Sequence, residues 1–338
     1  MSAGSANYLP VRDSWLALHA EPILDPALPI VDAHHHFYDR PGWTYLADAF
    51  LADAASGHRI EASVHMQAQT RYRAGSDPPL HPVGETEYVA ATARSFEGRG
   101  CDLAAGIVGH CDLRQGAASA RVLEAHLAAG QGRFKGVRHL STWDADRSLV
   151  NPLSAAPRGL LLDPAYRAGV AQLAPLGLSY DAWLFFTQLS ELRDLARAFP
   201  DTPVIVNHCG GVLRIGDYAA RRDEAFAQWS REMRALAALP NVFVKLGGLG
   251  MRINGFAFDA RPTPPASADL AEAWRPWIET CIEAFGAERC MFESNFPVDK
   301  GSYAYATVWN AFKRLTASAG AHERARLFSG TARHVYRL

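Results

Sequence analysis

Short apolar runs alternate with longer amphipathic stretches along most of this chain. The short runs are four to eight residues long and rich in β-branched and aromatic residues, a pattern typical of buried strands. Eight of them are expected to be strands: Ile30–His34, Ile60–Gln67, Leu103–Gly109, Lys135–Leu140, Leu178–Leu184, Val204–Asn207, Val242–Leu246 and Cys290–Glu293.

The longer stretches have the periodicity of helices. Between 226 and 239, for example, apolar residues recur every three or four positions, which predicts a helix with one buried face. The expected helices are Glu85–Glu97, Ala117–Ala129, Pro164–Leu173, Leu189–Ala198, Tyr218–Leu239, Ala268–Phe285, Tyr303–Leu315 and His322–Tyr336.

Strands that alternate with helices of this length are expected to pair in parallel through right-handed crossovers. Eight repeats favour a closed α/β architecture, the (β/α)8 TIM barrel, over an open sheet. Residues 1–29 are then an N-terminal extension that packs on the barrel, and residues 30–338 form a single barrel domain. A long stretch at about 247–267, after strand seven, has neither pattern and is expected to be a lid or a subunit contact.

Composition narrows the partners to small molecules. The formal net charge is −1 and the Lys and Arg residues do not cluster, which argues against nucleic acid or a membrane surface as a partner. A homo-oligomer remains open. The amino terminus lacks a basic and apolar export signal, so a cytoplasmic protein is expected. The five cysteines form no C-x-x-C pair and suit reduced thiols.

The first strand runs into the motif Ile30-Val31-Asp32-Ala33-His34-His35-His36. Because side chains alternate along a strand, His34 and His36 share one face. Two imidazoles at the mouth of a strand can hold one metal ion or one polarised oxygen. Such barrels place their chemistry at the carboxyl ends of the strands.

Other polar side chains recur at these predicted strand ends. Each taken singly is typical of a structural residue, but their recurrence around one rim indicates a site. They are His65 and Gln67, His110, Arg138 and His139, Asn207 and His208, Lys245, and Glu293, Asn295 and Asp299.

Four segments make the chain similar to a known family: Ile30–His36, Pro203–Gly210, Asn241–Gly247 and Arg289–Pro297. Their order and spacing resemble the lactonase branch of the amidohydrolase superfamily, the amidohydrolase 2 family, which includes 2-pyrone-4,6-dicarboxylate lactonases and L-fuconolactonases. The resemblance implies a (β/α)8 barrel and a hydrolase that opens a small lactone with water as the nucleophile. A metal-dependent decarboxylase of the superfamily and a non-catalytic ligand-binding barrel are the alternatives.

Asn295 is a departure from the family pattern, because most members carry an aspartate there that binds metal or accepts a proton. The base must then be a neighbouring carboxylate, Glu293 or Asp299, and its place in a loop beyond the strand favours Asp299. The fifth strand also lacks the histidine found in metal-rich members. One divalent metal, zinc or manganese, held by His34, His36 and His208, and a metal-independent reaction in which these imidazoles bind the carbonyl oxygen, therefore both remain open.

The predicted site has two sets of residues. The catalytic set is His34, His36, His208, Asn295 and Asp299. The cations and histidines near the rim predict an acidic substrate, because guanidinium groups match carboxylates. The substrate-binding set is His65, Arg71, Arg73, Arg138, His139, Lys245 and Arg252.

Overall fold

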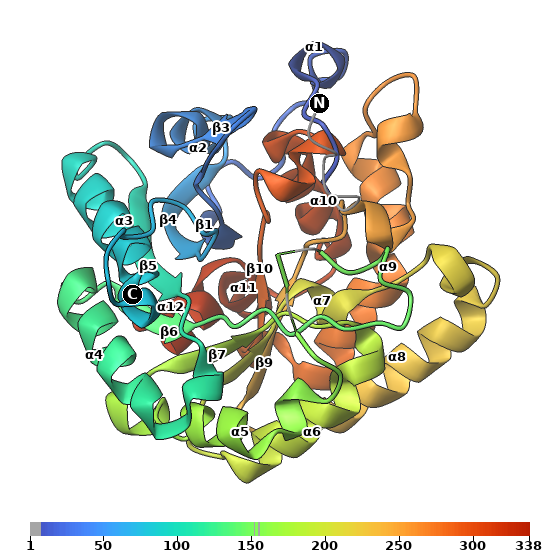
Figure 1. The fold of residues 1–338 in the computed structure, drawn as a ribbon. Helices are drawn as coiled ribbons and strands as arrows, with labels where there is room; N and C mark the ends of the chain where they lie inside the picture. The colour runs from blue at the N-terminus through green and yellow to red at the C-terminus, as the bar shows by residue number, and fades with distance from the viewer. Residues whose placement is uncertain (1–7, 152, 155) are drawn as a thin grey trace.

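Eight parallel strands form the centre of the molecule, which confirms the predicted (β/α)8 barrel (Figure 1). The computed structural model describes residues 8–151, 153, 154 and 156–338. Each barrel strand is hydrogen-bonded to the next one along the chain. The barrel strands are β1 Pro29–His35, β4 Arg59–Met66, β5 Asp102–Gly109, β6 Phe134–Val137, β7 Ser179–Ala182, β8 Val204–Val206, β9 Val242–Leu246 and β10 Cys290–Phe292. All eight predicted strands are present.

The first and last strands close the ring. The His36 N–H donates to the Phe296 carbonyl at 2.8 Å, and the Asn295 N–H donates to the His34 carbonyl at 2.9 Å. These bonds hold the two ends together just beyond the strands. The histidine motif of β1 therefore lies beside the segment that follows β10.

Helices surround the strands on the outside of the barrel (Figure 1). The main helices are α2 Ala47–Ala54, α3 Val83–Ser95, α4 Ser119–Gly130, α5 Pro164–Val170, α6 Leu189–Ala198, α8 Arg222–Ala237, α9 Ser267–Phe285 and α10 Tyr305–Leu315. The shorter ones are α1 Asp13–Leu16, α7 His208–Gly211, α11 Ala321–Ala325 and α12 Thr331–Tyr336. The predicted stripe of α8 is buried against the barrel, with Trp229, Met233 and Leu236 fully inaccessible.

The structure differs from the predicted helices in three places. The helix expected over 218–239 begins at Arg222, because a separate 3-10 turn occupies Gly216–Ala219. The helix expected over 322–336 is interrupted by a wider π-helical turn at Arg326–Gly330. Helix α2 and a small hairpin of β2 Tyr38–Arg40 and β3 Trp43–Tyr45 lie in a stretch where no element was predicted.

Helix α12 closes the amino-terminal end of the barrel. Its Tyr336 is buried together with the small and apolar side chains that fill the barrel interior, among them Val64, Met66 and Ile205. The Tyr336 hydroxyl donates to the Asp181 carboxylate at 2.9 Å. The C-terminal helix therefore reaches the polar groups beneath the opposite, carboxyl-terminal end.

The segment 8–29 runs along the outside of the barrel. The Leu24 N–H donates to Asn310 on α10 at 2.8 Å, and the Ser267 hydroxyl at the start of α9 donates to Glu21 at 2.8 Å. The long connection after β9 contains two 3-10 turns, Arg252–Asn254 and Phe258–Ala260. Hydrogen bonds thus hold the N-terminal segment against α9 and α10, and regular turns order the connection after β9.

All five cysteines are buried free thiols. None of the helices in the described part of the chain combines the length and the apolar character needed to cross a membrane.

Candidate active site

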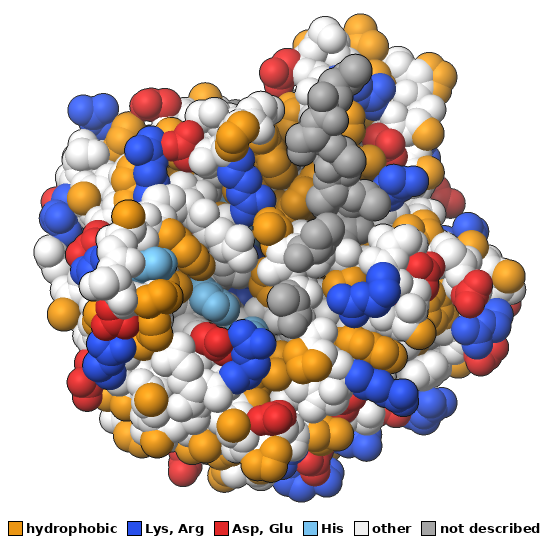
Figure 2. Space-filling model, viewed as in Figure 1, with side chains coloured by type: hydrophobic (Ala, Val, Ile, Leu, Met, Phe, Trp, Pro, Cys, Tyr) orange, Lys and Arg blue, Asp and Glu red, His pale blue; other side chains and the backbone are white. Residues whose placement is uncertain are grey.

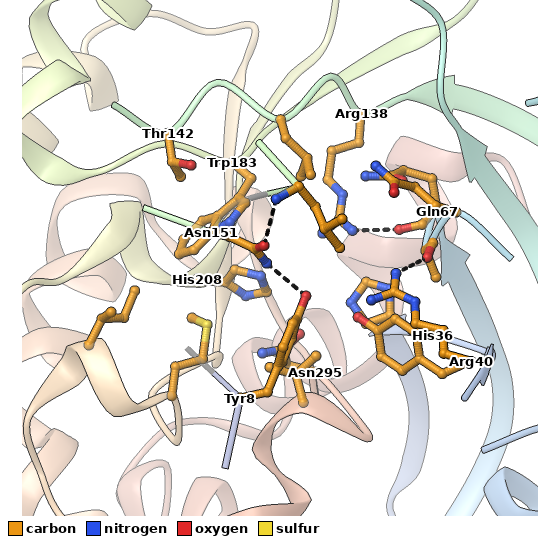
Figure 3. Close-up of a pocket in the computed structure, with 18 of the residues that line it drawn as sticks. Tyr8, His36, Arg40, Gln67, Arg138, Thr142, Asn151, Trp183, His208 and Asn295 are labelled. Carbon is orange, nitrogen blue, oxygen red and sulfur yellow. Dashed lines mark hydrogen bonds between the residues drawn. The ribbon is translucent and has the colours of Figure 1, made fainter. Parts of the chain in front are cut away.

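A cavity of about 60 Å³ opens at the carboxyl ends of the strands. Histidine side chains are visible in the hollow on this face of the molecule (Figure 2). In the close-up, His208 and Trp183 form one side of the cavity, and Arg138, Gln67, His36 and Arg40 form the other (Figure 3). The remaining lining residues are Tyr8, Tyr38, Ala68, Gln69, Leu140, Thr142, Asn151, Leu153, Phe185, Met251, Ile253, Asn295 and Val298.

Glu293 connects the two histidines that come from distant parts of the sequence. Its Oε2 lies 2.8 Å from His34 Nδ1, and its Oε1 lies 2.7 Å from His208 Nδ1. The His208 backbone N–H donates to the same Oε1 at 3.1 Å. The Glu293 and His34 side chains are fully buried, so this carboxylate holds both rings in one orientation.

These contacts assign the protons of the two rings. A carboxylate only accepts hydrogen bonds, so His208 donates to Glu293 through Nδ1–H. His34 Nδ1 lies close to Glu293 Oε2 but without the geometry of a hydrogen bond, so its proton is assigned from the other ring nitrogen. Arg138 only donates, and its Nη1 lies 3.1 Å from His34 Nε2, which must therefore carry a lone pair. Burial lowers the pKa of His34 well below its usual value and also lowers the pKa of His208. Both rings are thus neutral, with Nε2 unprotonated.

His36 completes a cluster of three imidazoles. Its Nδ1 donates to the Met66 carbonyl at 3.0 Å. Burial lowers the pKa of His36 and so favours the neutral ring. In that neutral ring the Nε2 atom is unprotonated. That nitrogen lies 3.1 Å from His34 Nε2. The centroid of the His34 ring lies 4.8 Å from the centroid of the His36 ring and 4.5 Å from that of the His208 ring. The predicted convergence of these three rings is therefore observed.

The Nε2 lone pairs of His34 and His36 lie 3.1 Å apart and repel each other, and the Arg138 guanidinium offsets this repulsion at His34 Nε2 only. Two nitrogens bound to one tetrahedral zinc ion at the usual ~2.1 Å lie roughly 3.4 Å apart, so this pair fits a metal ion. Ligand atoms of His34, His208 and Glu293 also lie within 4.8 Å of one another. Because the Glu293 oxygens lie beside Nδ1 of His34 and His208, this carboxylate would support these rings from behind. The Nε2 atoms of His34 and His36 thus fit one divalent metal, whereas His208 is grouped with His34 and Glu293 and not with His36.

Arg138 brings a fixed positive charge to the same group. Its side chain follows β6, is 5% exposed, and donates from Nη2 to the Gln67 carbonyl at 2.7 Å. Its Nε is buried and has no hydrogen-bond partner among the described residues. An arginine held in this way can stabilise negative charge that develops in the cavity.

The backbone around the site adopts strained conformations. His208, Cys209 and Asn295 have φ angles of 54°, 50° and 56°, in the left-handed region that residues with a Cβ rarely adopt. Such conformations cost energy and cluster at functional sites. Gly248 makes room for His208, because a Cβ at this position would lie 2.2 Å from His208 Nδ1.

Asp299 lies behind Asn295 and does not line the cavity. Its Oδ1 accepts from Asn295 Nδ2 at 2.9 Å, and its Oδ2 accepts from the Tyr303 hydroxyl at 2.5 Å and the Gly250 N–H at 2.9 Å. The structure therefore gives Asp299 the position of a support for Asn295. None of the described lining residues is a carboxylate.

The buried Asp299 should make stability depend on pH. Burial raises its pKa to about 7, whereas an unfolded chain ionises such a carboxyl near pH 4. Between about pH 4 and 7 the folded protein keeps a proton that the unfolded chain has lost, so this group lowers the free energy of unfolding as the pH rises. Above about pH 7 its contribution is constant.

Asp299→Asn, which stays neutral, is expected to show a weaker decline in stability over this range. Urea unfolding of both proteins from pH 4.5 to 8 measures the difference. Parallel curves for the two proteins would contradict the assignment.

Lys245 lies beneath the cavity. Its Nζ is 2.8 Å from Asp181 Oδ1, and neither side chain is accessible to solvent. Asp181 also accepts from Asn207 Nδ2 at 2.9 Å. Lys245 is thus placed inside the barrel and not at the mouth where the sequence predicted a substrate contact.

Five other predicted substrate-binding residues are not brought to this cavity. Arg71 pairs with Asp39 and Arg73 with Glu87, and the side chains of both arginines are more than one-third exposed. His65 is buried outside the lining and accepts from the Phe37 N–H at 3.2 Å. His139 lines a neighbouring small cavity and Arg252 a different one. A position close to the end of a predicted strand therefore did not indicate whether the side chain points into the cavity.

Three residues that line the cavity were not predicted from the sequence: Arg40, Tyr8 and Asn151. Arg40 lies four residues after the histidine motif, with its Cζ 4.5 Å above the Tyr38 ring, and it donates to the Ala68 carbonyl. Asn151 Nδ2 donates to the Tyr8 hydroxyl at 2.8 Å across the mouth (Figure 3). Only Arg40 had a usable signal, since it closely follows the motif.

This fold and this cluster of imidazoles define an amidohydrolase-type barrel. A family model described as Amidohydrolase matches residues 31–338, and the chain belongs to this family.

Three similar proteins cover nearly the whole chain. An uncharacterized protein, y4mH, of Sinorhizobium fredii is 34% identical over 297 residues, which are 87% of this chain and 86% of that protein. An L-fucono-1,5-lactonase of Burkholderia multivorans is 30% identical over 324 residues, which are 91% and 96% of the two chains. A crystal structure of an amidohydrolase from Burkholderia multivorans with bound zinc has a TM-score of 0.70 at 26% identity, and covers 91% of this chain and 99% of that chain.

Proposed function

We propose that this protein hydrolyses a small lactone that bears a carboxylate, with water as the nucleophile. The observation that carries the proposal is the pair of unprotonated Nε2 atoms, on His208 through its hydrogen bond to Glu293 and on His34 through its hydrogen bond from Arg138. Together with Arg138, this arrangement combines proton acceptors with a fixed positive charge. The L-fucono-1,5-lactonase named above supports lactones as the substrate class.

The residues suggest a division of roles. His208 lines the cavity and can accept a proton from the attacking water at Nε2, while Glu293 stabilises the imidazolium that forms. Arg138 and the Asn295 amide can donate to the carbonyl oxygen as it becomes an oxyanion. Asp299 and Tyr303 keep the Asn295 amide oriented. The strained ester of a lactone is a reasonable electrophile for this neutral set of bases.

Two of the histidines could also hold a divalent metal. When bound by His34 and His36, zinc or manganese would supply Lewis acidity toward the carbonyl oxygen and lower the pKa of water. Elemental analysis of the purified protein tests whether such a metal is present.

Arg40 is expected to select acidic substrates. Its side chain is half-buried in the cavity wall, where it donates to the Ala68 carbonyl and lies over the Tyr38 ring. Arg40→Gln should raise the KM for acidic lactones by about 10- to 100-fold, the usual value of a hydrogen bond to a charged group, and leave neutral lactones little changed. Steady-state kinetics on paired acidic and neutral lactones measure this difference.

Arg71→Gln is the matched control, because its guanidinium pairs with Asp39 outside the cavity. It should retain the kinetics of the unmodified protein. An equal loss with both substrate classes in Arg40→Gln would argue against an acidic substrate. If the folded protein, supplied with zinc or manganese, opened no lactone in a broad panel, the proposed function itself would be wrong.

A further inference from the structure

A second cavity of about 370 Å³ lies beside the catalytic one. It is formed between the segment 212–221, which follows α7, and the segment 247–266, which follows β9. Both cavities share Met251. The lining of the second cavity includes Arg214, Arg222, Arg252 and Phe256.

Positive charge dominates this second cavity. Three arginines line it, against one acidic residue, Asp259. The Arg214 guanidinium lies over the Phe256 ring, with Cζ 4.3 Å from the ring centroid. Its Nη1 is buried and has no hydrogen-bond partner among the described residues. A buried donor of this kind carries a desolvation cost that an anionic acceptor would remove.

Arg214 and Arg222 also interact unfavourably with each other. Burial lowers the pKa of Arg214, and the charge of Arg222 lowers it further. Two guanidinium groups held near each other are stabilised by an oxyanion between them, because each can donate two parallel hydrogen bonds to one carboxylate or phosphate.

The two segments around this cavity are interlocked. The Arg214 N–H donates to the Ile253 carbonyl at 3.0 Å, and Asn254 Nδ2 donates to the Val212 carbonyl at 3.0 Å. At Gly255, which has a φ of 62°, a Cβ would lie 2.8 Å from the Arg214 carbonyl oxygen. Arg214 is therefore presented by a built framework.

We propose that the second cavity binds a small anion with carboxylate or phosphate groups, through Arg214 and Arg222. A ligand there would lie against the segment that carries Met251 and Ile253 into the catalytic cavity. This binding is separate from the proposed lactone chemistry and does not require it.

Calorimetric titration of the full-length protein with inorganic phosphate and, separately, with succinate tests the proposal at constant ionic strength. We expect one of these probes to bind with a dissociation constant near or below about 1 mM. Arg214→Gln and Arg222→Gln should each weaken that binding by about 10-fold or more. A preference for phosphate or for succinate identifies the anionic group.

Two variants serve as controls. Arg231→Gln removes an arginine that lies on α8, like Arg222, and whose side chain is 67% exposed. Arg40→Gln removes an arginine from the catalytic cavity. Both should bind the probe as the unmodified protein does. Because Arg222 is exposed at the start of α8, Arg222→Gln keeps the test valid if Arg214→Gln fails to fold.

Three results would overturn the proposal. One is an unchanged affinity for the anionic probe in the folded Arg222→Gln protein, and also in Arg214→Gln if that variant folds. Another is loss of binding in Arg40→Gln, which would place the anion in the catalytic cavity. The third is a dissociation constant of roughly 10 mM or more, which would indicate an adventitious ion only.

Discussion

Replacing Glu293 by glutamine is expected to lower kcat for lactone opening by about 10²- to 10⁴-fold, as loss of a histidine-orienting carboxylate does in other hydrolases. The amide oxygen can accept from one Nδ1–H only. Its NH2 group must donate to the other ring, which then carries its proton on the Nε2 atom that His34 and His208 keep unprotonated. One imidazole therefore loses its capacity to accept a proton or bind a metal.

Steady-state kinetics with the best lactone of the panel measure this effect, and circular dichroism checks that the variant folds. Glu279→Gln is a suitable control, because Glu279 is half-exposed on α9, pairs with Arg275 and does not line the cavity. A Glu293→Gln protein with unchanged kcat would show that the bridge has no part in catalysis.

Replacing Lys245 by methionine is expected to lower the free energy of unfolding by about 3–5 kcal/mol, the usual cost of breaking one half of a buried ion pair. Asp181 would remain inside the barrel without its cation, although it would still accept from Asn207 and the Tyr336 hydroxyl. Denaturant unfolding with urea gives the difference directly.

The double variant Lys245→Met with Asp181→Asn should recover part of this loss, because the uncompensated charge is gone. If Lys245→Met were as stable as the unmodified protein, the ion pair would be energetically neutral. Lys245 would then be better explained as a group retained for function.

The barrel itself was predictable from local patterns. Each strand is buried on both faces, so its sequence is a short apolar run bounded by polar turns, and this signal survives without knowledge of the fold. Helix α2 was missed because it spans eight residues, Ala47–Ala54, with a weak apolar stripe. The interruption at 326–330 was missed because a π-helical turn keeps nearly the same spacing of apolar residues.

The candidate site was predictable only in part. His34 and His36 share a strand face, and the barrel predicts that His208 lies at the same rim, so their convergence followed from topology. The role of Glu293 could not be predicted in this way, because it depends on the side-chain directions of three strands at once. The same reason explains why Asp299, expected at the cavity, lies behind Asn295, and why Arg40 lines the wall where Arg71 and Arg73 were expected.

The sequence by itself determined the eight strands, their parallel order and the convergence of His34, His36 and His208, because strand periodicity and chain order are local properties. Only the tertiary structure decided which nitrogens are unprotonated and which cations face the cavity. A proton on a buried ring is assigned by its partners, and here those partners, Glu293 and Arg138, come from strands far apart in the chain.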